Sequence, residues 1–174
     1  MRQVRYAVAM SLDGYIAGPN GESDWIIMDP EIDFGEIFGR YDTVLLGRRT
    51  FQSMSHDGGG SMPGMRTIVF SRTLSPDDHP GVTVVGEGLE ESIAGLRMKP
   101  GKDIWLFGGG SLFRSLLEAR LVDAVDVAVI PVLLGGGIPL LPAPAPRVGL
   151  RLVSSKALKT GILLLDYAIE RGAA

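Results

Sequence analysis

The chain has 174 residues, a formal net charge of −3 and no cysteine, and 45% of its residues are hydrophobic. This length and composition predict one globular domain, spanning residues 1–174, with a core of its own. The acidic balance argues against a nucleic-acid partner and against an anionic membrane surface, since both select a basic face. Without cysteine the chain has neither disulfides nor thiolate chemistry, which is compatible with a cytoplasmic location. No apolar run reaches the roughly 20 residues of a membrane span, and the N-terminal run is too short for a signal peptide.

The first predicted strand covers residues 4–10 and ends in a glycine-rich loop at 11–21. A loop at the end of a first strand is well placed to close over a site. Asp13 in this loop has two interpretations, a turn former or a contact to a substrate. Its residue type alone favours the turn.

Residues 29–39 predict a helix with Asp29 as its cap, Pro30 in its first turn and an end near Gly39. The apolar side chains that would face the core are Ile32, Phe34, Ile37 and Phe38. The acidic side chains are Glu31, Asp33 and Glu36. Most acids on such a helix are simply solvated, but one that faces a cleft could bind a cationic or N–H-rich edge of a substrate.

Two further predicted strands, 43–46 and 66–70, both end in polar residues that suit phosphate. The residues after the first of them are Gly47, Arg48, Arg49 and Thr50. The second is followed by Ser71 and Arg72. An arginine fork meets two phosphate oxygens at once. The alternative is an exposed helix start with solvated charges, but the position at a strand end favours phosphate.

The chain is organised around residues 104–131, which pass from an apolar run through three glycines and a helical pattern to a second apolar run. This order predicts two parallel strands joined through a helix. Ligands of parallel sheets bind at the carboxyl ends of the strands, where bare backbone lets an anion reach the next helix. The residues at that end are Gly108, Gly109, Gly110, Ser111 and Leu112. They fit a phosphate or cofactor site as well as a tight turn, and they match neither G-x-G-x-x-G nor a P-loop.

The rest of the chain completes an α/β pattern. An amphipathic helix at 89–98 precedes the central unit, and a loop rich in Gly and Pro follows it at 132–146. Residues 150–158 and 162–169 predict a closing antiparallel hairpin. The chemistry of several enzyme classes is missing, because the only histidines, His56 and His79, lie in loop-like stretches and no serine completes G-x-S-x-G. A zinc site and a hydrolase are therefore not predicted.

Five motifs occur along the chain in a fixed order: SLDGYIAG, LLGRRTF, MPGMRTIVFSR, LFGGGSLF and VIPVLLGGGIPLL. Together they resemble the dihydrofolate-reductase-like superfamily. They are most similar to the reductase domain of the bacterial riboflavin-biosynthesis deaminase/reductase and its stand-alone relatives. The resemblance covers roughly residues 4–170. It implies a mostly parallel, eight-stranded sheet flanked by helices and closed by a C-terminal antiparallel hairpin.

The resemblance also implies NADPH as the cofactor. On the family pattern, the arginines and Thr50 lie at the cofactor phosphates, Ser71 and Arg72 at the adenosine 2′-phosphate, and the glycine turn beneath the pyrophosphate. The implied cofactor-binding residues are Gly47, Arg48, Arg49, Thr50, Ser71, Arg72, Gly108, Gly109, Gly110, Ser111 and Leu112. The resemblance further implies a cis bond between Gly108 and Gly109, and it puts the loop of Asp13 near the nicotinamide.

Departures from folate reductases affect the expected substrate. Met65 stands where those enzymes carry the arginine that binds the folate tail, and Ala128 stands where they carry a threonine. VLLGGGIPLL favours the riboflavin-type reductases, although the chain lacks their zinc deaminase half and begins at its own Met1. We therefore expect a reductase domain that stands alone.

The main hypothesis is an NADPH-dependent reductase that moves a hydride to a C=N or C=O carbon of a small polar substrate, such as a ribosylamino-pyrimidine or a pteridine. Asp13 and Asp33, with Glu31 behind them, are the candidates for substrate contact, and water is the expected proton source. One alternative is dihydrofolate reduction, and another is a module that senses NADPH without turnover. Because members of the family are often dimeric, a homodimer is expected, with the apolar region 127–141 as a candidate interface.

Overall fold

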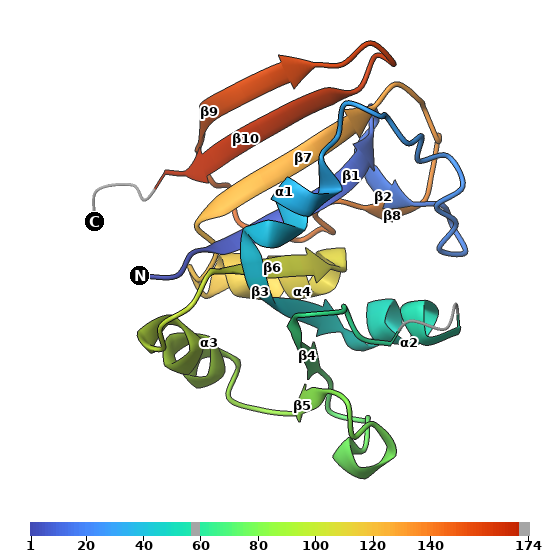
Figure 1. Cartoon of the computed structure of the whole chain (residues 1–174). Helices are drawn as coiled ribbons and strands as arrows, with labels where there is room; N and C mark the ends of the chain where they lie inside the picture. Colours follow the sequence, from blue (N-terminus) through green and yellow to red (C-terminus); the bar gives the residue numbers. More distant parts are fainter. Residues whose placement is uncertain (57–59, 171–174) are drawn as a thin grey trace.

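Short apolar runs separated by glycine- and proline-rich turns form the strands and helices of an α/β architecture. The computed structural model describes residues 1–56 and 60–170 (Figure 1). The strands are β1 (Val4–Ser11), β2 (Tyr15–Ala17), β3 (Tyr41–Gly47), β4 (Arg66–Phe70), β5 (Thr83–Val85), β6 (Asp103–Gly108), β7 (Ala124–Ile130), β8 (Ile138–Pro139), β9 (Leu150–Ala157) and β10 (Leu163–Ile169). The helices are α1 (Phe34–Gly39), α2 (Arg48–His56), the 3₁₀ turn η1 (Pro76–Asp78), α3 (Leu89–Met98) and α4 (Gly110–Glu118).

The main sheet has eight strands in the order β5-β4-β3-β6-β1-β7-β10-β9. The neighbours from β5 to β7 are parallel, whereas β10 is antiparallel to β7 and β9 is antiparallel to β10. This arrangement confirms the predicted sheet and its closing hairpin. The strands β6 and β7 run parallel, as predicted, but they are not neighbours, because β1 lies between them. The loop after β1 therefore emerges between the ends of β6 and β7.

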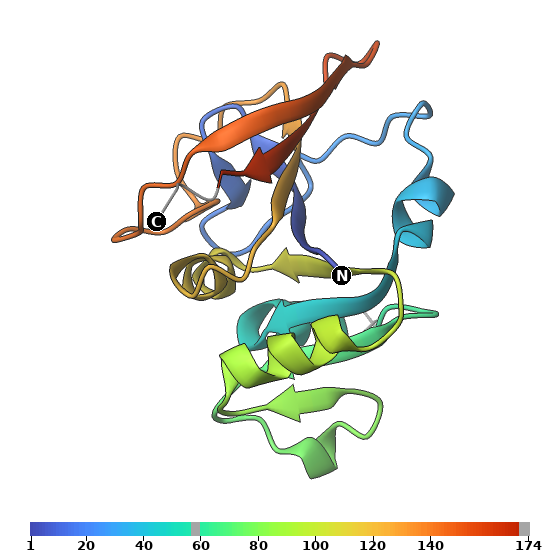
Figure 2. The ribbon, with the colours of Figure 1, turned by 90° about the vertical axis from the view of Figure 1, so that its left-hand side faces the viewer.

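Alternating side chains fill both faces of this sheet. On one face, residues such as Leu45 and Leu106 pack with the buried side chains of α3 and α4. On the other face, Val44 and Trp105 pack with Phe51 of α2 and with α1. Figure 2 shows α4 and α1 on opposite sides of the sheet. Within the described part of the chain, no helix is long and apolar enough to cross a membrane.

The predicted helix at 29–39 is wrong at its start. The helix begins at Phe34, and Asp33 is its cap, since the Asp33 carboxylate accepts a hydrogen bond of 2.9 Å from the backbone N–H of Glu36. Phe34 and Phe38 are 36% and 41% exposed instead of buried. A helix of six residues covers only part of the sheet. Phe38 therefore packs on the edge of the core, 5.6 Å from Trp105 between ring centroids.

The strands β2 and β8 were not predicted. They lie inside the segments 11–21 and 132–146, which the pattern assigns to loops, and they pair antiparallel with each other. With three and two residues they are too short to show a periodic pattern. Of the predicted interface region 127–141, the part up to Ile130 belongs to β7, whose residues Val127 and Val129 are in the core.

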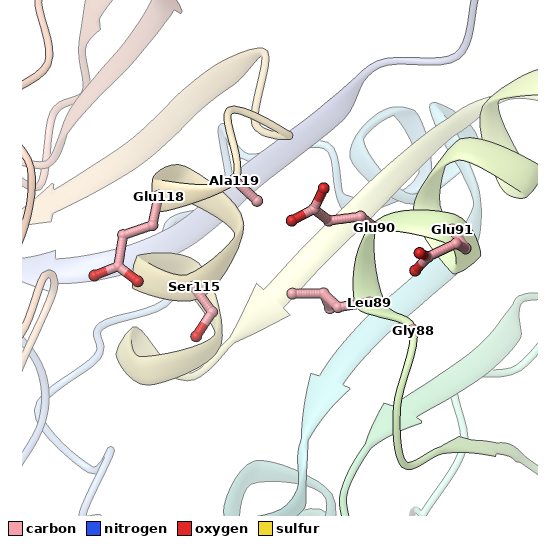
Figure 3. A pocket seen from close by; sticks show the side chains of 7 residues that line it. All are labelled: Gly88, Leu89, Glu90, Glu91, Ser115, Glu118 and Ala119. Carbon is pink, nitrogen blue, oxygen red and sulfur yellow. The ribbon is translucent and has the colours of Figure 1, made fainter.

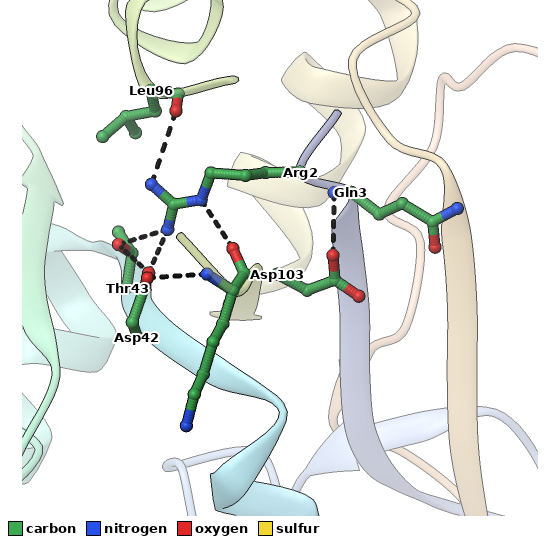
Figure 4. Close-up of polar contacts among 7 residues, drawn as sticks. Arg2, Gln3, Asp42, Thr43, Leu96 and Asp103 are labelled. Atoms are coloured by element: carbon green, nitrogen blue, oxygen red, sulfur yellow. Dashed lines mark hydrogen bonds and ion pairs between the residues drawn. The ribbon is translucent and has the colours of Figure 1, made fainter. Parts of the chain in front are cut away.

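Arg2 joins three segments at the amino edge of the sheet (Figure 4). Its guanidinium is paired with Asp42 and donates to the Thr43 hydroxyl at 2.8 Å and to the Lys102 carbonyl at 2.5 Å. The side chain is 7% exposed, so these partners replace the hydrogen bonds to water that the cation loses on burial. Arg2 thus connects the N-terminal strand to β3 and to the turn before β6.

A second ion pair lies on the face of the main sheet that α1 covers only in part. Arg5 of β1 and Asp126 of β7 form two hydrogen bonds of 2.8 Å, and their side chains are 12% and 11% exposed. Burial raises the pKa of the Asp126 carboxyl, and the guanidinium of Arg5 opposes that rise. The pair is thus stable as a unit, whereas either charge alone would be left desolvated.

We expect Asp126→Ala to lower the free energy of unfolding by about 3 kcal/mol, because the charge of Arg5 remains buried without its partner. The double variant Arg5→Met/Asp126→Leu should recover most of that loss, since it removes both charges and keeps the volume. Urea denaturation of the three proteins measures the effect. A single variant as stable as the unsubstituted protein would show that water replaces the missing carboxylate.

Candidate functional site

The carboxyl ends of the parallel strands β4, β3, β6 and β1 meet along one edge of the sheet. Gly47 at the end of β3 is paired with Phe70 of β4, and Leu46 is paired with Gly108 of β6. The segments that follow these strands are therefore neighbours, although they lie far apart in the sequence. The structure brings together the predicted phosphate-binding segments 47–50, 71–72 and 108–112.

The glycine turn and the start of α2 are in direct contact. A Cβ on Gly47 would lie 3.7 Å from the carbonyl oxygen of Gly108 and 3.7 Å from the nitrogen of Gly109. A Cβ on Gly109 would lie 3.3 Å from the hydroxyl of Thr50, which is closer than most such contacts allow. The peptide bond between Gly108 and Gly109 is cis, as the resemblance implied. The two segments thus form one continuous surface of backbone.

The first turn of α4 is open to an anion. Its cap residue is Gly109, and no side chain accepts a hydrogen bond from the turn. The backbone N–H groups of Gly110 and Ser111 have no acceptor within the helix, because the first acceptor, the Gly109 carbonyl, receives Leu112 and Phe113. Unsatisfied N–H groups and the helix dipole make such a turn positive.

Cationic side chains surround this edge. Arg48 and Arg49 are exposed in the first turn of α2, which begins directly after β3. At the next strand end, the Ser71 hydroxyl accepts hydrogen bonds from the backbone of Thr73 and Leu74, at 3.2 and 3.1 Å. This turn leaves Arg72 exposed. The edge therefore combines helix N–H groups with three arginines, which is the chemistry that binds phosphate.

An open hollow of about 620 Å³ lies between α3 and α4 (Figure 3). Its lining residues are Gly88, Leu89, Glu90, Glu91, Ser115, Glu118 and Ala119. The segment before α3 runs past the Ser71 turn, because the N–H of Ser71 donates to the Val85 carbonyl at 2.9 Å, three residues before Gly88 of the hollow. Its charged lining residues are the glutamates Glu90, Glu91 and Glu118, so the hollow itself is acidic.

Asp13 is exposed but accepts three hydrogen bonds from its surroundings. Its carboxylate accepts from the hydroxyl of Ser11 at 2.7 Å and from the backbone N–H groups of Leu134 and Gly135 at 3.1 and 2.7 Å. The Ser11 hydroxyl is the main reason why the pKa of Asp13 lies below its usual value. Asp13 therefore orders the backbone between two loops, in line with its interpretation as a turn former.

The other two candidate acids are not in contact with Asp13. Asp33 is the cap of α1, and Glu31 lies 3.8 Å from the amino groups of both Lys156 and Lys159 of the C-terminal hairpin. Both carboxylates are exposed, so they remain available to a substrate. The structure does not join the three acids into one cluster.

Asp29 was predicted as a helix cap, and the structure gives it another place. It is 3% exposed, accepts a hydrogen bond from the Thr160 hydroxyl and accepts a second one of 2.7 Å from the N–H of Glu31. The bond from Thr160 is the main cause that lowers its pKa. Asp29 thus connects the segment before α1 to the tip of the hairpin between β9 and β10. An Asp-Pro pair carries no sign of a partner so distant in sequence.

We expect Asp29→Ala to lower the melting temperature at neutral pH, and the difference from the unsubstituted protein to shrink below the ordinary carboxyl pKa of 3.8. A carboxyl whose pKa is lowered by folding stabilises the protein above its unfolded pKa and loses this effect as the pH falls through the folded value. Thr160→Val removes the main donor and should reproduce the loss at neutral pH. Melting curves between pH 2 and 7 measure it, and a difference independent of pH would contradict this role.

Comparison with known proteins assigns the chain to a family. Residues 2–164 match the model of the RibD C-terminal domain family. The chain belongs to this family. It is 32% identical to the uncharacterized protein YyaP of Bacillus subtilis (strain 168), over 95% of this chain and 94% of that protein. The predicted relation to riboflavin-type reductases is thereby confirmed.

Solved structures show the same fold. A protein from Shewanella sp. PV-4 that is named for riboflavin biosynthesis has a TM-score of 0.84 at 26% identity, over 98% of this chain and all (100%) of that one. The deaminase/5-amino-6-(5-phosphoribosylamino)uracil reductase of Thermotoga maritima has a TM-score of 0.73 at 20% identity, and the match covers 97% of this chain but only 57% of that one. Dihydrofolate reductase from Enterococcus faecalis, solved with NADP(H), has a TM-score of 0.71 at 22% identity, over 97% and 96% of the two chains. The predicted dihydrofolate-reductase-like fold is confirmed.

Proposed function

We propose that this protein is an NADPH-dependent reductase that acts on a small polar substrate, similar to the 5-amino-6-(5-phosphoribosylamino)uracil reductases. The proposal rests on one observation. The helices α2 and α4 both begin at the edge of the sheet where the neighbouring strands β3 and β6 end. Family membership supports a reductase, and the E. faecalis structure shows NADP(H) on the same fold. Few other side chains at this edge suit proton transfer, so the redox chemistry is left to a cofactor.

The residues present fit a dinucleotide phosphate. The glycine turn offers bare backbone, since a Cβ on Gly109 would already crowd Thr50. The N–H groups of Gly110 and Ser111, together with Arg48 and Arg49, would bind the diphosphate. Thr50 would add a hydroxyl from α2. When bound, NADPH supplies the hydride that reduces the substrate.

The adenosine end would lie toward the next strand. Arg72 follows β4 and is exposed, and the Ser71 turn is hydrogen-bonded to Val85, which precedes the hollow between α3 and α4 in the chain. A guanidinium at this position would pair with the 2′-phosphate that distinguishes NADPH from NADH. The hollow would then receive the adenosine.

At the other end of the site, Asp33 and Glu31 are the proposed substrate contacts, because their carboxylates are exposed beside α1 and the hairpin. Such acids would bind an amino- or N–H-rich edge of a pyrimidine or pteridine. The proton that accompanies the hydride would come from water.

We expect one molecule of NADPH to bind per chain and Arg72→Ala to weaken that binding about tenfold, the order expected when one charge-assisted hydrogen bond is lost. Binding of NADH should not change, since it lacks the 2′-phosphate. Arg66→Ala is the matched control, because Arg66 is also exposed but lies at the opposite end of β4. Calorimetric titration measures all three proteins. Absence of NADPH binding to the unsubstituted protein would overturn the proposal, and an equal loss for both nucleotides would remove Arg72 from the 2′-phosphate.

We also expect the protein to oxidise NADPH in the presence of a ribosylamino-pyrimidine. The absorbance of NADPH is followed with a panel that contains this pyrimidine and dihydrofolate, and without any substrate as the control. Turnover with dihydrofolate alone would identify a folate reductase. Tight binding without turnover on any member of a broad panel of C=N and C=O compounds would instead favour the sensing module.

A further inference from the structure

Residues 131–142 form a strap that crosses the site edge from the end of β7 to the start of α4. The strap carries β8, which pairs with β2 in the loop after β1. Two backbone hydrogen bonds of 2.9 Å secure it to that loop, from Leu12 to the Val132 carbonyl and from Leu140 to the Gly14 carbonyl. The strap and the loop after β1 therefore form one unit.

The far end of the strap lies close to Gly110, the first residue of α4. A Cβ on Gly110 would lie 2.7 Å from the carbonyl oxygen of Pro139 and 3.1 Å from that of Leu140. Both neighbours are backbone atoms, so they cannot move aside as a flexible side chain would. The position of the strap therefore determines where α4 begins.

Asp13 holds the middle of the strap. Its two carboxylate oxygens accept the N–H groups of the consecutive residues Leu134 and Gly135. The same carboxylate accepts the hydroxyl of Ser11, which is fully buried and in turn accepts the N–H of Tyr15 at 3.0 Å. Hydrogen bonds to an ionised carboxylate are about twice as strong as neutral ones. Three donors from the chain thus bind the carboxylate that the sequence suggests as a substrate contact.

We propose that Asp13 is a positioning residue, which keeps the strap against α4 and thereby sets the N–H groups of Gly110 and Ser111 for the cofactor diphosphate. This inference rests on the proposed function, because it concerns the same diphosphate site. Asp13 acts on the cofactor through the strap residues Pro139 and Leu140, without touching it. The acid after the first strand is then part of the cofactor site and not of the substrate site.

The test is a double-mutant cycle on NADPH binding. Asp13→Ala releases the strap, and Gly110→Ala displaces it, so each should weaken NADPH binding about tenfold, as expected for misplacing a charge-assisted contact. Both changes act through the strap. The double variant should therefore bind NADPH with nearly the same affinity as whichever single variant binds it less tightly. Asp13→Asn keeps one acceptor oxygen and should fall between Asp13→Ala and the unsubstituted protein.

Amide hydrogen exchange without the cofactor provides a second readout. In Asp13→Ala the amides of Leu134 and Gly135 should exchange faster, and those of Gly110 and Ser111 should shift in the NMR spectrum. Asp166→Asn is the matched control, since Asp166 also accepts a serine hydroxyl, that of Ser154 at 2.6 Å, but lies away from the strap. It should leave NADPH binding and these amides unchanged.

The possible outcomes separate the two proposals. If the unsubstituted protein does not bind NADPH, the proposed function fails, and unchanged Gly110 and Ser111 amides would also refute the link from Asp13 to α4. If it binds NADPH but Asp13→Ala binds equally well, or if the two substitutions weaken binding independently, the positioning role is wrong. Unchanged NADPH binding with a raised KM for the substrate would return Asp13 to the substrate site.

Discussion

Close approach of bare backbone at the carboxyl edge of the sheet is the constraint on which the candidate site depends. A Cβ on Gly47 would touch the glycine turn, and one on Gly110 would meet the carbonyl oxygens of the strap. At Gly110 a Cβ would overlap with a carbonyl oxygen, so only glycine allows α4 to start there. The cap residue before it, Gly109, has no side chain, and the uncapped N–H groups of α4 are what an anion would bind.

Strand order turns these local features into one site. Because β1 lies between β6 and β7, the loop after β1 meets the strap that follows β7. Because β3 lies between β4 and β6, the arginines of α2 lie beside the glycine turn. The net charge of the chain is −3, yet three arginines gather at this edge. A local positive potential in an acidic protein attracts a polyanion to one place.

The hydrogen bonds of three aspartates show that they have different roles, although all three look alike in the sequence. Asp13, Asp29 and Asp33 all occur near turns, but Asp13 accepts from the strap, Asp29 from the hairpin and Asp33 from its own helix. Glu31 lies near two lysines of the hairpin. Asp13 and Asp29 thus connect segments that are distant in sequence, whereas Asp33 bonds only its own helix.

Local pattern predicted most of the sheet. The strands β4 and β7 and the helix α3 have the bounds that hydrophobic periodicity indicates, because each buries a regular set of side chains. The start of α1 was missed, because Asp29 before Pro30 has the residue types of a helix cap but bonds elsewhere. The strands β2 and β8 were missed, because neither is long enough to bury a face.

The amino-acid sequence by itself determined the elements with a regular apolar period, the glycines and arginines at their ends, and the family to which those motifs belong. These are properties of neighbouring residues, so they can be read without coordinates. The tertiary structure decided which strand ends are adjacent, that β1 separates β6 from β7, and that Asp13 faces the strap. Such contacts join residues that are distant in sequence, up to 122 positions apart for Asp13 and Gly135. No local period records which of the possible partners a buried or polar group meets.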